Sequence, residues 1–150
     1  MTSILTSAEI DRFLSQQRFG RLGVHADGRT YVVPISFVVT AENRLIGQTK
    51  AGMKVDMMRA NPEVCIETDE IKGIADWTSV IVWGTYKELK GAEANAAMGA
   101  LIDHLAPLVE ETGGGRSPRD VTPREPEGGP QVDIVYEVLI TEKTGRSERP

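Results

Sequence analysis

The spacing of apolar residues predicts that the chain opens with one short helix. Thr6-Ser7-Ala8-Glu9 has the pattern of a capping box, in which the Thr6 hydroxyl accepts from the backbone three residues on and Glu9 reaches back. Ile10, Phe13 and Leu14 then recur at helical spacing. We therefore expect a small amphipathic helix whose apolar face packs on a larger body.

Beyond residue 18, short apolar runs separated by turn residues are typical of strands. Asp27-Gly28 and Glu42-Asn43 are tight-turn sequences, and strands joined by tight turns must run antiparallel. The predicted strands cover residues 19–24, 31–39, 44–49, 63–68, 79–89 and 132–141.

Two further helices are predicted at 52–60, where Asn61-Pro62 ends the pattern, and at 92–111. Residues 112–131 contain five glycines and four prolines without periodicity, which is typical of a lid, a partner-contacting arm or a mobile loop. Short antiparallel strands around one central helix favour a single domain of 150 residues that is mostly β, a small closed barrel with helices.

Charge and composition narrow the possible partners. The chain has 17 Lys and Arg against 22 Asp and Glu, a net charge of −5, which argues against nucleic-acid binding. No apolar run approaches the ~20 residues of a membrane span. The N-terminus lacks an export signal, so we expect a cytoplasmic protein that does not contact a membrane.

The sequence gives little support for a metal site or a reactive cysteine. His25 and His104 lack carboxylate or thiol neighbours at ligand spacing, so no metal site is expected. For His104, beside Asp103, we expect a solvated or capping role. Cys65 is the only cysteine and is predicted to be a buried, inert thiol within a strand.

Pro34 stands in the middle of the predicted strand 31–39. Proline has no N–H and is expected only at a strand edge or a bulge. It is either a plain edge-strand proline, or it marks a strand opened so that neighbouring backbone groups can bind a planar, hydrogen-bonding ligand.

The segment from Gly47 to Lys54 joins a predicted strand to a predicted helix start. Unpaired N–H groups and the positive end of the helix dipole suit a phosphate there, and Thr49 and Lys54 add a hydroxyl and a charge. The alternative is a surface lysine on an ordinary capped helix. The glycine and lysine spacing does not match a Walker loop.

Taken in order, several segments resemble the flavin-binding split-barrel superfamily related to pyridoxamine 5′-phosphate oxidase, and within it the nitroimidazole-resistance branch. The segments that carry the resemblance are Phe19-Gly-Arg-Leu-Gly, Val33-Pro34-Ile35-Ser36-Phe37, the Gly47–Lys54 loop, Met58-Arg59-Ala60-Asn61-Pro62-Glu63-Val64-Cys65, Trp77-Thr-Ser-Val-Ile-Val-Trp-Gly84 and Ile140-Thr-Glu-Lys-Thr-Gly145-Arg146. They cover most of the chain.

The resemblance implies a six-stranded antiparallel split β-barrel that forms a homodimer with FMN between its subunits. It maps the strand that contacts the isoalloxazine ring onto Val33, Pro34, Ile35 and Ser36. It maps the phosphate loop onto Gln48, Thr49, Met53 and Lys54. Ser79 matches a position that often contacts the flavin ring.

The chain departs from the branch at two of these positions. Gln48 stands where the branch typically has histidine, and an amide cannot donate a proton near neutral pH as imidazole can. Met53 stands where a basic residue usually precedes Lys54, which removes one phosphate partner.

The predicted strand 79–89 is apolar on both faces, with Val80 and Val82 on one and Ile81 and Trp83 on the other. Such a strand needs cover outside the barrel, and a second subunit would supply it. Trp77 and Trp83 are expected to cover the ring, the dimer seam or the core. The nearby acidic cluster is expected to be a solvated loop; it comprises Glu67, Asp69, Glu70 and Asp76.

Two classes of function follow from these observations. The first is an FMN-binding oxidoreductase acting on a small molecule, in which the flavin carries the electrons and no side chain is identified as the catalytic acid or base. The second is a non-catalytic flavin store or sensor on the same barrel. A deazaflavin-dependent reductase is a third alternative, and haem is disfavoured because neither histidine falls in a matching ligand segment.

Overall fold

The computed structural model describes residues 1–111 and 133–150. Within these ranges the helices are α1 (Ser7–Gln16), α2 (Met53–Ala60) and α3 (Gly91–Glu111). The strands are β1 (Thr2–Ile4), β2 (Phe19–Ala26), β3 (Arg29–Ser36), β4 (Val38–Val39), β5 (Arg44–Lys50), β6 (Glu63–Gly73), β7 (Asp76–Leu89) and β8 (Asp133–Glu148). The predicted loop 112–131 lies outside the described residues.

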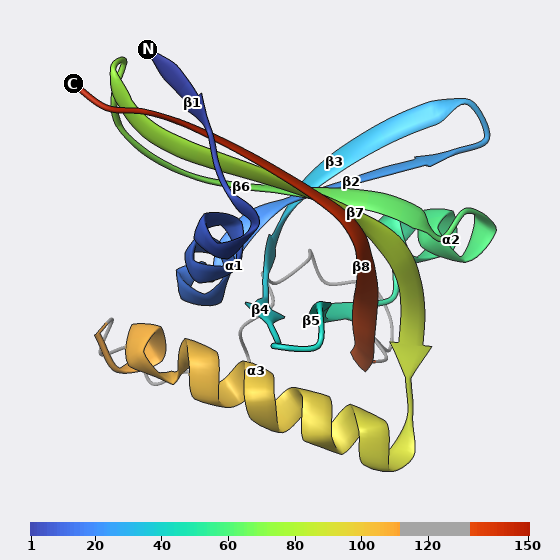
Figure 1. Ribbon diagram of the computed structural model, residues 1–150. Coiled ribbons are helices and arrows are strands. Elements are labelled where there is room, and N and C mark those ends of the chain that lie inside the picture. The colour runs from blue at the N-terminus through green and yellow to red at the C-terminus, as the bar shows by residue number, and fades with distance from the viewer. Residues whose placement is uncertain (112–132) are drawn as a thin grey trace.

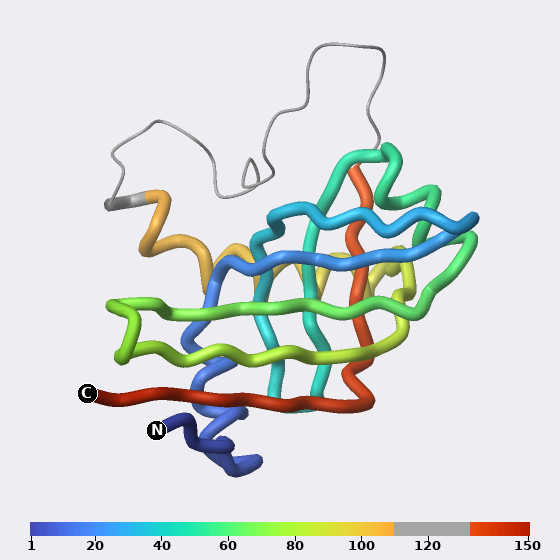
Figure 2. Tube along the Cα trace, turned by 90° about the horizontal axis from the view of Figure 1, so that it is seen from above, coloured from blue at the N-terminus to red at the C-terminus, as the bar shows by residue number. Residues whose placement is uncertain are grey.

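The strands form one antiparallel sheet in the order β3-β2-β6-β7-β8-β5-β4, and β1 pairs with the end of β8. β3 and β4 stand at opposite ends of this order, yet only Phe37 separates them in the chain. The sheet therefore curls back on itself, with β4 and β5 crossing beneath β2, β3 and β6 (Figures 1 and 2). This confirms the predicted mostly-β split barrel, although the described residues form eight strands where six were expected.

Five of the six predicted strands are correctly placed, although several are too short. The predicted strand 31–39 is wrong as a single strand, because it breaks at Phe37 into β3 and β4. The predicted strand 63–68 continues to Gly73, the strand 79–89 begins at Asp76, and the strand predicted to end at 141 continues to Glu148. The expected solvated acidic loop is therefore wrong, because its residues lie on the long β6–β7 hairpin. Charged residues do not end an antiparallel strand whose outer face meets water.

Two apolar layers hold the fold together. The barrel interior is filled by side chains of all the long strands, together with Ile10 and Leu14 of α1. A second cluster packs Leu101 and Leu105 of α3 onto Ile46 of β5. In Figure 1, α3 accordingly runs below β4 and β5. Among the described helices, none has the length and apolarity to cross a membrane.

The local signals at the N-terminus and the turns are confirmed. The Thr6 hydroxyl accepts from the Glu9 N–H (3.2 Å), and the Glu9 carboxylate accepts from the Thr6 N–H (3.0 Å). Asp27 and Gly28 both have positive φ, at 52° and 76°, as a tight hairpin turn requires. Asn43 also has positive φ.

His104 and Cys65 differ from expectation. The half-buried His104 ring places Nε2 2.8 Å from the Gln17 carbonyl oxygen, and Arg18 Nε donates to the His104 carbonyl (2.9 Å). These contacts tie α3 to the segment between α1 and β2, so the predicted solvated role is wrong. The ring does contact a helix cap, because Gln17 is the C-cap residue of α1. Cys65 is only half-buried, since it lies on the outward side of β6.

Candidate ligand site at the split of the barrel

β3 leaves alternate backbone groups unpaired along one edge. The Phe37 N–H donates to the Arg18 carbonyl oxygen (2.9 Å), so Phe37 and Arg18 form the first hydrogen-bonded residue pair between this segment and β2. Such pairs alternate along an antiparallel ladder. The register therefore turns the backbone groups of Pro34 and Ser36 away from β2, toward the free edge. The N–H that Pro34 lacks would have pointed into this edge, so the proline costs β3 no ladder bond.

β5 faces the same opening with unpaired groups of its own. The Thr40 N–H donates to the Arg44 carbonyl oxygen (2.8 Å), and by the same alternation Gln48 and Lys50 turn their backbone groups toward the β3 side. β5 pairs with the two residues of β4, and the described strands show no pairing of β3 with β5. Backbone donors and acceptors therefore line both sides of this opening, which we call the split.

Gln48, whose backbone groups turn toward the split, also carries an unmatched side-chain acceptor, on the face of β5 that Ile46 presents to α3. Its amide oxygen Oε1 is buried and has no hydrogen-bond partner among the described residues. A buried acceptor left unmatched costs free energy, which a donor on a ligand would recover. This buried amide oxygen is a feature that the sequence alone could not show.

α2 begins directly after β5, at the end of the split. Its N-cap is Gly52, which supplies no side chain to cap the first turn. An uncapped helix start is suited to an anion, because its N–H groups and dipole present positive charge. Met53 and Lys54 are the first two residues of the helix, and Met53 is 49% exposed.

Three predicted site residues do not present their side chains at the split. Thr49 is 1% exposed and its hydroxyl donates to the Lys50 carbonyl (3.2 Å), so it faces the barrel interior. Ile35 is buried, and Val33 packs against the same core. Val33 and Ile35 bond to β2 through their backbones. Pro34 and Ser36 are therefore the residues of this strand whose backbone groups face the split.

Ser79 lies on β7, three strands away from β3 in the order β3-β2-β6-β7, or about 14 Å at the usual strand spacing. Its hydroxyl donates to Glu67 Oε2 (3.1 Å). Arg21 Nη1 donates to Glu67 Oε1 and to Asp69 Oδ2, both at 3.2 Å. In register, Arg21 stands opposite Pro34 on one side and Glu67 on the other.

Sequence reasoning missed this charged network, although one signal was available. Glu67 and Asp69 are two residues apart on a strand, which places both on one face. Burial first, and then the neighbouring Asp69 carboxyl, raise the pKa of Glu67, against the lowering effects of the Ser79 hydroxyl and Arg21.

The network lies on a sheet face that no helix of the described chain covers (Figures 1 and 2). We call it the outer sheet face; its members are Phe19, Arg21, Val32, Pro34, Cys65, Glu67, Asp69, Ser79, Ile81 and Trp83. Val32 and Trp83 border a groove of about 290 Å³ on this face. Within the described residues, no group of His, Cys, Asp and Glu could hold a metal ion.

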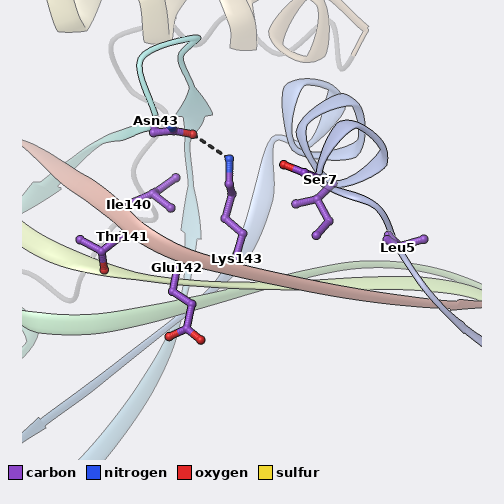
Figure 3. A pocket seen from close by; sticks show the side chains of 8 residues that line it. Leu5, Ser7, Asn43, Ile140, Thr141, Glu142 and Lys143 are labelled. Atoms are coloured by element: carbon purple, nitrogen blue, oxygen red, sulfur yellow. Dashed lines mark hydrogen bonds between the residues drawn. The ribbon is translucent and has the colours of Figure 1, made fainter.

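A second pocket, of about 300 Å³, lies between α1, the turn before β5 and β8. Lys143 Nζ donates there to Asn43 Oδ1 (2.7 Å; Figure 3). It also donates to Asp11 Oδ1 (2.6 Å). Because the ammonium group bonds to two internal partners, it ties β8 to α1 and to the turn. The pocket includes no predicted site residue.

Comparisons with known proteins agree with the fold described above. Residues 6–147 match the family model for pyridoxamine 5′-phosphate oxidase. An uncharacterised protein of Rhizobium meliloti is 29% identical over 147 residues, which are 96% of this chain and 93% of that protein.

Two solved structures illustrate the likeness. A FAD-binding protein from Mesorhizobium loti is 25% identical, with a TM-score of 0.77 over 100% of this chain and 98% of that one. A protein from Bacteroides thetaiotaomicron described as a 5-nitroimidazole antibiotic resistance protein is 17% identical, with a TM-score of 0.69 over 98% and 87%.

The alternation of β3 predicts losses of stability of different size at two neighbouring positions. Pro34→Ala adds an N–H that points into the split, so we expect a loss of only about 0.4–1 kcal/mol, from the more flexible unfolded chain. Val33→Pro deletes an N–H that bonds to β2 and should cost several times more. Urea unfolding of both variants measures this difference, and equal losses would contradict the register.

Proposed function

Because the chain belongs to the pyridoxamine 5′-phosphate oxidase family, we propose that it binds FMN at the split between β3 and β5. The observation that carries the proposal is the split itself, with backbone groups of Pro34, Ser36, Gln48 and Lys50 turned into it. A flavin ring edge alternates carbonyl acceptors with an N–H donor. A backbone lining that offers both kinds of group fits such an edge.

The phosphate is assigned to the start of α2. Gly52 leaves the first turn without a side-chain cap, and Lys54 adds a full positive charge. Thr49 is left out of this contact set, because its side chain lies inside the barrel. Met53 contributes no charge, so the lysine and the helix start carry the phosphate.

A second copy of the chain is proposed to cover the outer sheet face. Phe19, Val32 and Trp83 are 59%, 61% and 37% exposed there, which is a large apolar surface to leave in water. The face also carries both Arg21 and two acids, as a self-complementary interface requires. The distance of Ser79 from β3 means that the Ser79 completing a ring site would come from the other copy.

Bound flavin would supply hydride or electron transfer, and the chain would bind, orient and shield it. We propose an oxidoreductase that acts on an unidentified small molecule. The alternative is a flavin store or sensor. Gln48 favours this alternative, because its amide supplies no proton near neutral pH.

Flavin titration tests the site. The fluorescence of FMN should be quenched, or its absorbance shifted, until the protein is saturated. Lys54→Ala should raise the dissociation constant of FMN roughly 10- to 150-fold, the effect of one charge-assisted contact. The matched control is Lys87→Ala, an exposed lysine on β7, which should bind like the parent. An unchanged constant in Lys54→Ala would place the phosphate elsewhere, and tighter binding of FAD than of FMN would correct the cofactor.

Reduction of the loaded protein separates enzyme from store. An oxidoreductase should lose its flavin absorbance on addition of NADH or NADPH under nitrogen and regain it in air. A store or sensor should keep the oxidised spectrum on the same timescale. The measurement is the absorbance near the flavin maximum, with free FMN as the reference.

Trp83→Glu tests the second copy. The new charge would be buried against an apolar partner, so we expect the dimer to dissociate and FMN affinity to fall with it. Sedimentation velocity measures the first effect. Ile74→Glu, which adds the same charge at an exposed position in the turn between β6 and β7, should leave the dimer intact. A dimer that survives Trp83→Glu would place the interface elsewhere.

A further inference from the structure

The outer sheet face carries an acidic pair whose charge is only half neutralised. Glu67 and Asp69 both approach a single guanidinium nitrogen, Arg21 Nη1, at 3.2 Å. The remaining Glu67 oxygen accepts from the Ser79 hydroxyl at 3.1 Å. One cation therefore serves two carboxylates, and the cluster has a net charge of −1 when both are ionised.

The other charged groups on this face do not correct the imbalance. β3 contributes the uncharged Pro34 opposite Arg21. His25 of β2 is hydrogen-bonded to Thr30 (3.0 Å) at the far end of the face. The remaining charged residues that face outward, from β6 and β8, are Glu63, Glu142, Arg146 and Glu148, and the Met1 ammonium group lies 3.4 Å from Glu148. They comprise three acids against one arginine and one ammonium group, so they add negative charge.

The pair is water-accessible in a single copy, with the Glu67 and Asp69 side chains 32% and 20% exposed. Apolar side chains surround it on the same face, Phe19 and Trp83 among them. A second copy on this face would remove the remaining water from both carboxylates. A buried site with two carboxylates and one arginine disfavours the second negative charge.

We propose that the Glu67–Asp69 pair takes up one proton from solvent when a second copy covers the outer sheet face, so that self-association strengthens as the pH falls. This inference rests on the proposed dimer. It makes flavin binding depend on pH, because flavin bound between the subunits would be held more firmly where the dimer is stronger, at lower pH.

The direction follows from linkage. In a single copy, burial and Asp69 already raise the pKa of Glu67 above its usual value. Covering the face raises it further, so the dimer holds more protons than two separate copies between the two pKa values. Each proton taken up changes the association constant by up to tenfold per pH unit. Two symmetric pairs give up to about 100-fold per pH unit.

Sedimentation equilibrium of the full chain at pH 5, 6, 7 and 8, at constant ionic strength, tests this inference. The dimer dissociation constant of the parent should rise with pH. Glu67→Gln keeps the shape of the side chain but removes the charge, so its dimer should be tighter at pH 8 and its pH dependence nearly flat. Asp69→Asn is the second variant and should also flatten the profile.

Two controls isolate the pair. Glu42→Gln changes an acid in the exposed turn before β5 and should keep the parental slope. His25→Gln removes the imidazole of β2, at the far end of the same face, and should keep the parental slope too. A slope that is lost in His25→Gln, or retained in both Glu67→Gln and Asp69→Asn, would overturn the inference. A dimer dissociation constant of the parent that does not change with pH would also overturn the inference. A parent protein that is monomeric at every pH would instead contradict the proposed dimer.

Discussion

The bend at Phe37 determines both how the barrel closes and where it stays open. Phe37 is fully buried, and its N–H bonds to Arg18 of β2. One residue later the chain pairs with β5 instead. A strand that changes partner in so short a distance cannot satisfy both neighbours along its whole length. The backbone groups just before the bend therefore lack a strand partner, although buried backbone groups in proteins are almost always paired.

The architecture around the bend assigns separate tasks to the two sides of the sheet. The inward side chains of β2, β6 and β7 make the core, with Leu22, Ile66 and Val82 almost without exposure. The outward side chains of the same strands are mixed, with apolar residues around a charged centre. α3 covers the other half of the barrel, so the outer sheet face is left to water or to another protein (Figure 1).

Local sequence signals predicted local structure well. The capping box at Thr6, the Asp27-Gly28 turn and the positions of five of the six predicted strands depend on residues close together in the chain, and all are confirmed. The predicted strand 31–39 is wrong as one strand, because it breaks at Phe37. The family was also recognisable from short segments in order. Pro34 was correctly read as a residue that must stand at an edge.

What could not be predicted depends on pairing between distant strands. Thr49 faces inward and Gln48 outward because of how β5 meets β8, and a run of apolar and polar residues did not settle that choice. The separation of Ser79 from Pro34 follows from the strand order, which puts β2 and β6 between them. The role of His104 depends on where α3 docks, which short-range patterns do not encode.

Pro34 has a further consequence for the chain in a crowded solution. An unpaired strand edge is a template on which a foreign strand can add, the first step toward aggregation. At Pro34 the edge of β3 lacks the donor that an added strand would need, and the rigid ring occupies its place. The edge of β3 at the split is therefore poorly suited to the addition of a foreign strand.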